Sequence, residues 1–320
     1  MRKGEVNSMS LLIQYTLIYA SVLFLVALGG CFSEHSGVIN LGLEGVMVMG
    51  ALGGALVMKF MTGLSALPMM IMVVLGSILF GMVFSLFLAV AAVNFNADQT
   101  LVGTAMNMLA TAAATVFVKA LNMMKDPNNV SSTIQYIKQK KAISVHLGSF
   151  ELNWFMVIAV LALAASVVIL YRTRFGLRLM ACGEHPQAAD SVGINVYKMR
   201  YAGVLISGLL GGLGGIAYIT AGVSEWKFEN GVAGFGFLAL AVMIFGQWKP
   251  VNIALAALLF GLLRALSNVY TGFQGLVALG LPSTLYNMLP YIISLLVLAI
   301  ASTNSRAPKA EGIPYDKGQR

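Results

Sequence analysis

Few residues of this chain could do chemistry, and the most conspicuous is a carboxylate. Glu44 lies with Asn40 in the stretch GVINLGLEG, within an apolar run at 38–58. A charged group at the centre of a bilayer costs ~2.5–3.5 kcal/mol unless it is paired or neutralised, so this position indicates a structural ion pair or a function. Arg264, the one charged residue of the run 251–270, is the expected partner. A structural Glu44–Arg264 pair and a role of Glu44 in a solute pathway are both open alternatives.

Weaker candidates for a polar pathway lie in two other apolar runs. Thr104 and Asn107 are three residues apart and therefore share one face of a helix. Phe235 and Phe237 open a short run at 233–247, where they could stack on a flat solute. Polar residues in membrane helices also join helices by hydrogen bonds, and aromatic residues gather at membrane interfaces. The alternative for all four residues is therefore packing.

Residues of the kinds used in catalysis and metal binding do not form a motif. Cys31 and Cys182 have neither disulfide nor metal-ligand spacing, and the three histidines are scattered. The sequence contains no Ser/His/Asp arrangement, no HExxH and no glycine-rich phosphate loop with its lysine. We therefore expect no catalytic residue, no metal and no cofactor. A membrane-embedded enzyme and a secondary transporter are the less favoured alternatives.

The second group of polar residues is the stretch 171–200, which lies between two apolar runs. It carries five arginine and lysine side chains and two acidic ones. Inside it, GEHPQAADSVG predicts a short helix, because Pro186 suits the first helical position, Glu184 suits the positive end of the helix dipole, and Gly193 suits the end. The expected helix has about seven residues and a length of ~10 Å.

A helix of two turns is unstable alone in water, so we expect this one to be packed, either against its own bundle or in a groove of a partner protein. Two small side chains, Ala188 and Ala189, would let a partner approach closely. The alternative is an ordinary loop that lies on the membrane surface.

The elements that must position these residues are membrane-spanning helices. Of 320 residues, 58% are hydrophobic and only 10% are charged, and the mean hydropathy of +0.84 is far above that of soluble domains. A helix needs about 20 apolar residues to cross a hydrocarbon core of ~30 Å. The sequence therefore predicts an all-α, polytopic membrane protein with about nine spans, at 11–32, 38–58, 67–93, 101–121, 153–171, 202–222, 233–247, 251–270 and 284–301.

The polar connections indicate a single membrane domain, 1–320, and its orientation. The longest are 122–152, 171–200 and the tail 303–320, and each is too short to build a core of its own. Three closely spaced arginines mark 171–200 as cytoplasmic. Because five predicted spans precede that stretch, we expect the N-terminus and 122–152 to be extracellular and the tail to be cytoplasmic. The net charge of +8 fits loops beside lipid head groups, and nucleic acid is not expected.

Two of the runs are expected to be broken or re-entrant helices, a feature that marks binding sites in transporters. The run 38–58 begins among glycines, and 233–247 is short and opens AGFGF. A Ser-Glu pair precedes each run, at 33–34 and 224–225, which suggests an inverted repeat as a hypothesis. By contrast, GLLGGLGG at 208–215 spaces glycines four residues apart, and this pattern predicts close helix packing.

Longer stretches of the sequence resemble one family. ACGEHPQAADSVGINVYKMRYAGVLISGLLGGLGGIAY at 181–218 is similar to the coupling-loop region of permease subunits from ATP-binding-cassette importers of the branched-chain amino acid, simple sugar and nucleoside group. Similarity continues, in the family's order, in FSEHSGVINLGLEGVMVMGA at 32–51, NADQTLVGTAMNMLA at 96–110, GFGFLALAVMIFGQWKP at 234–250 and MLPYIISLLVLA at 288–299. These stretches resemble the nucleoside, guanosine-type permeases of that group.

The resemblance implies a function and a set of partners. A second, related permease subunit would enclose the pathway with this one, two ATP-binding subunits would lie beneath them, and an extracellular lipoprotein would select the solute. ATP hydrolysis would then belong to a partner, and this chain would be a multi-pass protein of the cytoplasmic membrane rather than an enzyme. Nucleosides are the expected solutes, and simple sugars are the alternative.

The resemblance also implies that the short helix docks into a cleft on the ATP-binding subunit. Gly183 and Gly193 would set the turns on either side of it. By resemblance, the docking contact consists of Gly183, Glu184, Pro186, Ala188, Ala189 and Gly193. Sugar permeases of the group usually begin with one additional span, which this sequence lacks.

Overall fold

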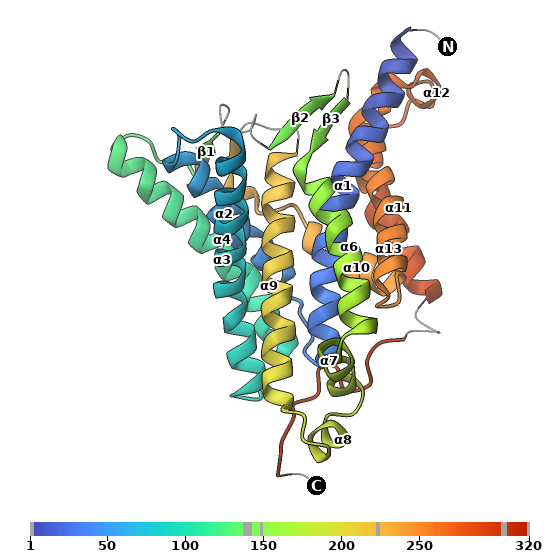
Figure 1. Ribbon diagram of the computed structural model, residues 1–320. Coiled ribbons are helices and arrows are strands. Elements are labelled where there is room, and N and C mark those ends of the chain that lie inside the picture. Colours follow the sequence, from blue (N-terminus) through green and yellow to red (C-terminus); the bar gives the residue numbers. More distant parts are fainter. Residues whose placement is uncertain (1–2, 137–142, 148–149, 222–224, 302–305, 319–320) are drawn as a thin grey trace.

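The computed structural model describes residues 3–136, 143–147, 150–221, 225–301 and 306–318 as a bundle of long helices (Figure 1). The N-terminus lies at one end of the bundle and the C-terminus at the other. The helices are α1 (Lys3–His35), α2 (Leu43–Phe60), α3 (Ala66–Val93), α4 (Gln99–Lys125), α6 (Trp154–Arg172), α7 (Arg174–Glu184), α8 (Pro186–Ser191), α9 (Val196–Thr220), α10 (Phe235–Phe245), α11 (Pro250–Val269), α12 (Gln274–Val277) and α13 (Ser283–Ala301).

The helices confirm the predicted fold class. In the described part of the chain, seven helices are long and apolar enough to cross a membrane, and they coincide with seven of the predicted spans. The last predicted span coincides with α13. The remaining one, α10, has 11 residues, or ~16 Å, and is too short to cross a hydrocarbon core of ~30 Å alone. It forms only the second half of a broken crossing, as its sequence predicts.

The first break lies between α1 and α2, at residues 36–42. Ser33 Oγ donates to the carbonyl of Val38 at 2.7 Å, and Gly37 has a φ of +91° that favours glycine. The second break, at 225–234, includes positive φ values at Gly231 and Gly234. Each break therefore has the local residues that allow the backbone to leave the helical path inside the bundle.

Close packing around α9 confirms the prediction from the 208–215 glycines. Gly208 and Gly212 face α3, and Gly211 and Gly215 face α2. A Cβ atom on Gly211 would lie 2.9 Å from Val46, and one on each of the other three would collide with an atom of the facing helix. The glycines therefore let α9 lie in the centre of the bundle, where 78% of an apolar 18-residue stretch of this helix is buried.

Short strands that the sequence does not predict lie at the N-terminal end of the bundle (Figure 1). β1 (Thr133–Gln135) pairs antiparallel with β4 (Glu225–Lys227), and β2 (Ser144–Leu147) pairs antiparallel with β3 (Phe150–Asn153). The β1–β4 pair joins the 122–152 connection to the start of the second break. The two sheets thus cover the end that the charge pattern assigns to the outside.

Candidate functional site

The intramembrane carboxylate lies where the two broken helices meet. Glu44 is in the first turn of α2, and its two oxygens accept hydrogen bonds from the backbone amides of Gly234, at 2.8 Å, and Gly236, at 2.6 Å. These amides belong to the start of α10, where helical N–H groups have no partner of their own and the helix dipole is positive. Glu44 therefore caps α10 from another helix. We call this contact the Glu44 junction.

The structure does not pair Glu44 with Arg264, which is one of the two alternatives that the sequence leaves open for Glu44. The ion pairs found among the described residues do not join these two side chains. The Arg264 guanidinium instead lies over two aromatic rings, 5.5 Å from the centroid of Phe235 and 5.9 Å from that of Tyr19. The backbone amides of α10 bind the carboxylate, and the aromatic faces attract the guanidinium, whose buried Nε has no hydrogen-bond partner among the described residues.

Two asparagines from the pathway candidates hold the first break in place. Asn107, on α4, accepts from the Gly45 amide and donates to the Leu41 carbonyl, both at 2.8 Å. Asn40 is fully buried and donates to Ser207 Oγ at 2.9 Å. Both side chains satisfy polar groups that the break would otherwise leave unpaired, so the geometry assigns them a structural role.

The two aromatic candidates have different surroundings. Phe235 is fully buried, and its ring lies 4.3 Å from that of Tyr218 and 5.8 Å from that of Tyr19. Phe237, two residues later, is 53% exposed. Phe235 therefore belongs to the packing around the Glu44 junction, whereas Phe237 faces outward, where it could contact a solute or a partner.

A row of hydroxyl groups runs along one face of α4. Thr104 is exposed and shares one face of the helix with three further threonines, which are spaced by four or seven residues: Thr100, Thr111 and Thr115. All four are exposed or half-buried. We call this set the α4 threonine row. The sequence contains the signal for this row, because the four threonines are spaced by four and seven residues, which are helical spacings.

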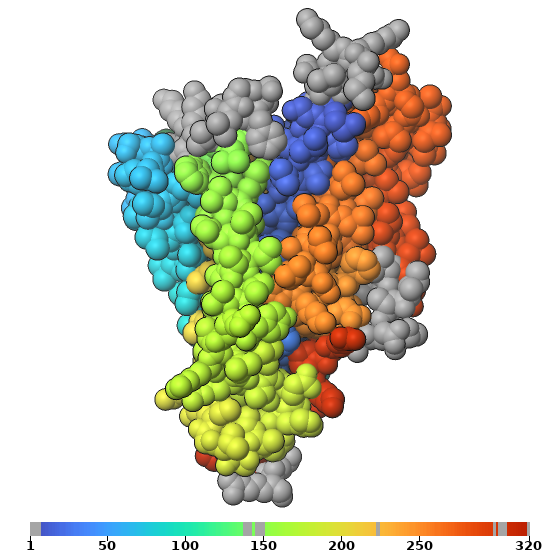
Figure 2. Space-filling model, turned by 45° about the vertical axis from the view of Figure 1, so that its right-hand side comes forward, coloured from blue at the N-terminus to red at the C-terminus, as the bar shows by residue number. Residues whose placement is uncertain are grey.

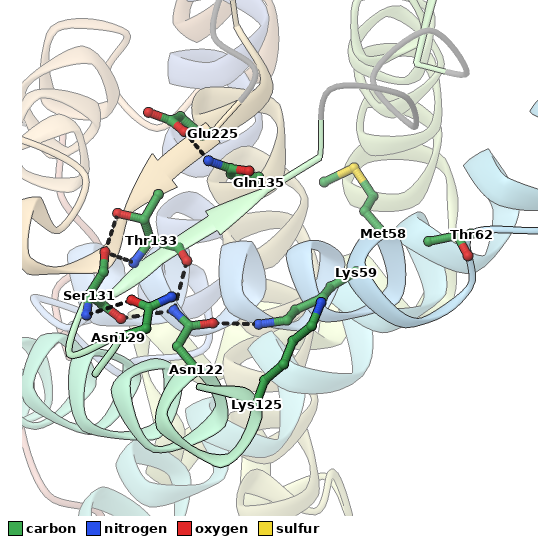
Figure 3. Close-up of a pocket in the computed structure, with 10 residues that line it drawn as sticks. All are labelled: Met58, Lys59, Thr62, Asn122, Lys125, Asn129, Ser131, Thr133, Gln135 and Glu225. Carbon is green, nitrogen blue, oxygen red and sulfur yellow. Dashed lines mark hydrogen bonds between the residues drawn. The ribbon is translucent and has the colours of Figure 1, made fainter. Parts of the chain in front are cut away.

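A polar pocket opens at the C-terminal end of the same helix (Figure 3). It has a volume of about 600 Å³. Lys59 Nζ donates to Asn122 Oδ1 at 2.7 Å, and the Asn122 amide nitrogen donates to the carbonyls of Ser131 and Thr133. Lys125 also faces this pocket. Neither lysine pairs with a carboxylate among the described residues, so the pocket presents two ammonium groups at this end of the bundle.

At the opposite end, the stretch between α6 and α9 forms a projection from the bundle, seen in Figure 2 as the yellow-green region below the membrane helices. The predicted short helix is present as α8, with Pro186 in its first turn. Gly193 has a φ of +85° and nothing within 4 Å of its Cβ position, as expected for a residue that ends a helix with a turn. A second helix, α7, precedes α8 and was not predicted.

The structure corrects the turn that the resemblance implies at Gly183. Gly183 lies inside α7, and a Cβ atom there would collide with the carbonyl oxygen of His35. The glycine therefore permits close approach of α7 to the end of α1 rather than a change of chain direction. The sequence cannot distinguish these two uses, because both require the absence of a side chain.

The six predicted docking residues divide between two faces of the projection. Gly183, Pro186 and Ala189 are buried, and Ala189 is only 4% exposed. The residues that face outward are Glu184, Ala188 and Gly193, and beside them Gln187, Ser191 and Val192. Val192 is 76% exposed, and the residue pattern of the sequence does not single it out.

The predicted inverted repeat is only partly within the described residues. Ser224 lies outside them. Glu34 is buried at the α7 end of the bundle, whereas Glu225 belongs to β4 at the other end. α2 and α10 start at the Glu44 junction and run toward opposite ends, which is the arrangement that an inverted pair requires.

Comparison with known proteins gives one family. The model of the branched-chain amino acid transport system permease component matches residues 12–299. The guanosine ABC transporter permease protein NupQ of Bacillus subtilis is 40% identical over 98% of this chain and 99% of its own length. The nucleoside permease protein NupC of Lactococcus lactis is 38% identical over 98% and 99%. A putative glucose permease protein of Haloferax volcanii, TsgC13, is 34% identical over 80% and 76%.

Proposed function

Because the chain belongs to the family of branched-chain amino acid transport system permease components, we propose that it is the permease subunit of an ATP-binding-cassette importer that carries nucleosides across the cytoplasmic membrane. The observation that carries this proposal is the similarity, over nearly the whole length, to a guanosine permease and a nucleoside permease. In this proposal a separate subunit hydrolyses ATP.

The projection formed by α7 and α8 supports the proposed contact with an ATP-binding subunit. Its outward face carries small or neutral side chains, Gln187, Ala188, Ser191 and Val192, so a partner can approach the backbone closely without burying a charge. Glu184 lies at the edge of this face and is exposed. A short helix presented in this way fits a groove on another protein.

The proposed assembly contains two further proteins. The relatives come in pairs within one organism, NupB with NupC in Lactococcus lactis and NupP with NupQ in Bacillus subtilis, which supports a second, related permease subunit. An extracellular binding lipoprotein is the proposed source of solute. The polar pocket, with its ammonium groups from Lys59 and Lys125, offers such a partner a surface for acidic side chains.

We place the solute route beside the α4 threonine row and Phe237. Only 28% of an apolar 18-residue stretch of α4 is buried within this chain. Much of the helix is therefore free to face a second permease across the route. Hydroxyl groups can exchange hydrogen bonds with a ribose, and an exposed ring can stack on a base. Charged side chains are scarce along this face, which favours a neutral solute over a phosphate or a free amino acid.

The substrate is tested by competition. In cells whose only nucleoside uptake system is this one, uptake of labelled guanosine or adenosine should require ATP and should be inhibited by excess unlabelled nucleoside. Excess ribose or glucose should leave the uptake unchanged. Inhibition by the sugars without inhibition by nucleosides would contradict the nucleoside proposal and favour a simple-sugar importer, which the similarity to the glucose permease protein makes the second candidate.

The coupling contact is tested on its exposed alanine. Replacing Ala188 with arginine should lower uptake and co-purification of the ATP-binding subunit by at least about tenfold, which corresponds to ~1.4 kcal/mol of lost contact energy. The protein should remain in the membrane, because Ala188 is exposed. Ala188→Ser, which keeps the side chain small, is the matched control and should behave like the wild type. Normal uptake and normal co-purification of Ala188→Arg would show that α8 is not the docking contact.

A further inference from the structure

The C-terminal segment runs back across the cytoplasmic end of the bundle and lies against the projection, as the red segment in Figures 1 and 2 shows. We call residues 306–318 the C-terminal strap. Two of its backbone amides donate hydrogen bonds to the bundle: the Ala310 amide donates to the carbonyl of Gly183 at 2.8 Å, and the Gly312 amide donates to that of Gly37 at 3.3 Å. The first bond joins the strap to α7 and the second joins it to the break before α2.

A buried cation fixes the next part of the strap. Arg200, near the start of α9, is 1% exposed, and its Nη2 donates to the carbonyl of Ile313 at 2.9 Å. Its Nε and Nη1 have no hydrogen-bond partner among the described residues. Among the described residues, the Ile313 carbonyl is therefore an acceptor that this guanidinium can hardly replace. Loss of the strap would remove that hydrogen bond from a buried charge.

An aromatic ring of the strap closes the inner face of α8. Tyr315 is 3% exposed and packs with Cys182, Ala189 and Val196 in a small apolar cluster. The ring also meets that of Tyr197 edge-on, with centroids 5.4 Å apart. Tyr315 is thus the contact that joins α7, α8 and the start of α9 in one cluster.

A pair of carboxyl groups seats the strap on the end of α1. The Glu311 carboxyl forms a side-chain hydrogen bond with that of Glu34, the residue just before His35 at the end of α1. Burial raises the pKa of the Glu311 carboxyl above its ordinary value. Two carboxyl groups in such contact need a proton between them, so the strap docks with one proton shared by the Glu34–Glu311 pair.

These contacts place the strap between the projection and the break at 36–42, which leads into the Glu44 junction. We propose that the C-terminal strap transmits the position of α8 to the break at 36–42, and that Tyr315 is the positioning residue of this link. This inference rests on the proposed function, because it assumes that α8 receives the motion of an ATP-binding subunit. The strap bonds both α7 and Gly37, so a displacement of the projection pulls directly on the break.

The chain contains its own reporter for the strap. Cys182 lies under Tyr315 and is fully buried, and Cys31, its one companion in the sequence, is buried within α1. Cys31→Ser keeps a donor for the hydrogen bond to the Trp248 carbonyl and leaves Cys182 as the single thiol. The rate at which a maleimide labels Cys182 in inside-out membrane vesicles holding the assembled transporter then measures whether the strap is docked.

In this background, Tyr315→Ala should label at least about tenfold faster than the parent, since the strap no longer covers the thiol. Nucleoside uptake in cells should fall by about the same factor while the ATP-binding subunit still co-purifies, because the outer face of α8 is unchanged. Tyr315→Phe keeps the ring over Cys182 and should therefore label much more slowly, and take up more nucleoside, than Tyr315→Ala. A chain that ends after Pro308 serves as a second variant and should behave like Tyr315→Ala.

Two results would overturn the proposal. Unchanged labelling in Tyr315→Ala and in the shortened chain would show that the strap does not cover α8. Fast labelling with normal uptake would show that the strap docks but transmits nothing. Failure of the parent transporter to co-purify any ATP-binding subunit is a different result, which contradicts the proposed function itself and is read from the parent alone.

Discussion

Replacing Glu44 with alanine should remove most of the folded protein that can be extracted in detergent. The substitution leaves the amides of Gly234 and Gly236, which now donate to the carboxylate at 2.8 and 2.6 Å, without an acceptor inside the membrane. Each buried unsatisfied amide costs on the order of 1–3 kcal/mol. Two of them amount to a large share of the 5–15 kcal/mol that stabilises a typical protein. Size-exclusion chromatography of the solubilised variant measures the loss.

A double-mutant cycle separates this explanation from the ion pair that the sequence suggests. If the α10 amides hold Glu44, then Glu44→Gln and Arg264→Gln should each reduce folded protein, and the double variant should show the two losses added together. If the two charges stabilised each other, the double variant would recover much of the loss, because the cost would come from a charge left alone. Recovery in the double variant would therefore return us to the ion pair.

The importance of Glu44 could be predicted from the sequence, but the groups that bind its carboxylate could not. A carboxylate among glycines in an apolar run marks Glu44 directly, because few other residue types are so costly at that depth. Its actual partners are backbone amides, which every residue has and which leave no trace in residue type. A side chain such as Arg264 is visible in the sequence, so the residue pattern points to it rather than to the backbone amides.

The projection between α6 and α9 shows the same limit in another form. Pro186 and Gly193 act on the backbone next to them, so the short helix between them could be predicted from local residue types. Which face of that helix is buried depends on Tyr315, more than a hundred residues further along the chain. A polar tail has no periodicity that would indicate such a contact. For this reason Ala188 and Ala189 looked equivalent in the sequence, although only Ala188 is exposed.

The close packing of α9 leads to a prediction about Gly212→Ala. Whether this substitution raises or lowers stability decides between helix propensity and overpacking as the larger effect. Gly212 lies within α9 beside α3, and a Cβ atom there would collide with the carbonyl oxygen of Ser77. By helix propensity alone, Gly→Ala should stabilise a helix by about 0.5–1 kcal/mol. Overpacking a close contact instead costs about 1–3 kcal/mol, and here the obstacle is backbone, which cannot move aside like a side chain.

We therefore expect Gly212→Ala to lower the thermal stability of the purified protein in detergent, although alanine is the better helix former. Gly63→Ala, in the turn between α2 and α3, is the control for the added methyl group. Nothing lies within 4 Å of a Cβ atom there, so its melting temperature should stay close to that of the wild type. A Gly212→Ala protein that melts at or above the wild-type temperature would mean that α9 and α3 have room to separate. Close packing would then not be what keeps α9 at the centre of the bundle, next to both the broken helix α2 and the projection that carries α8.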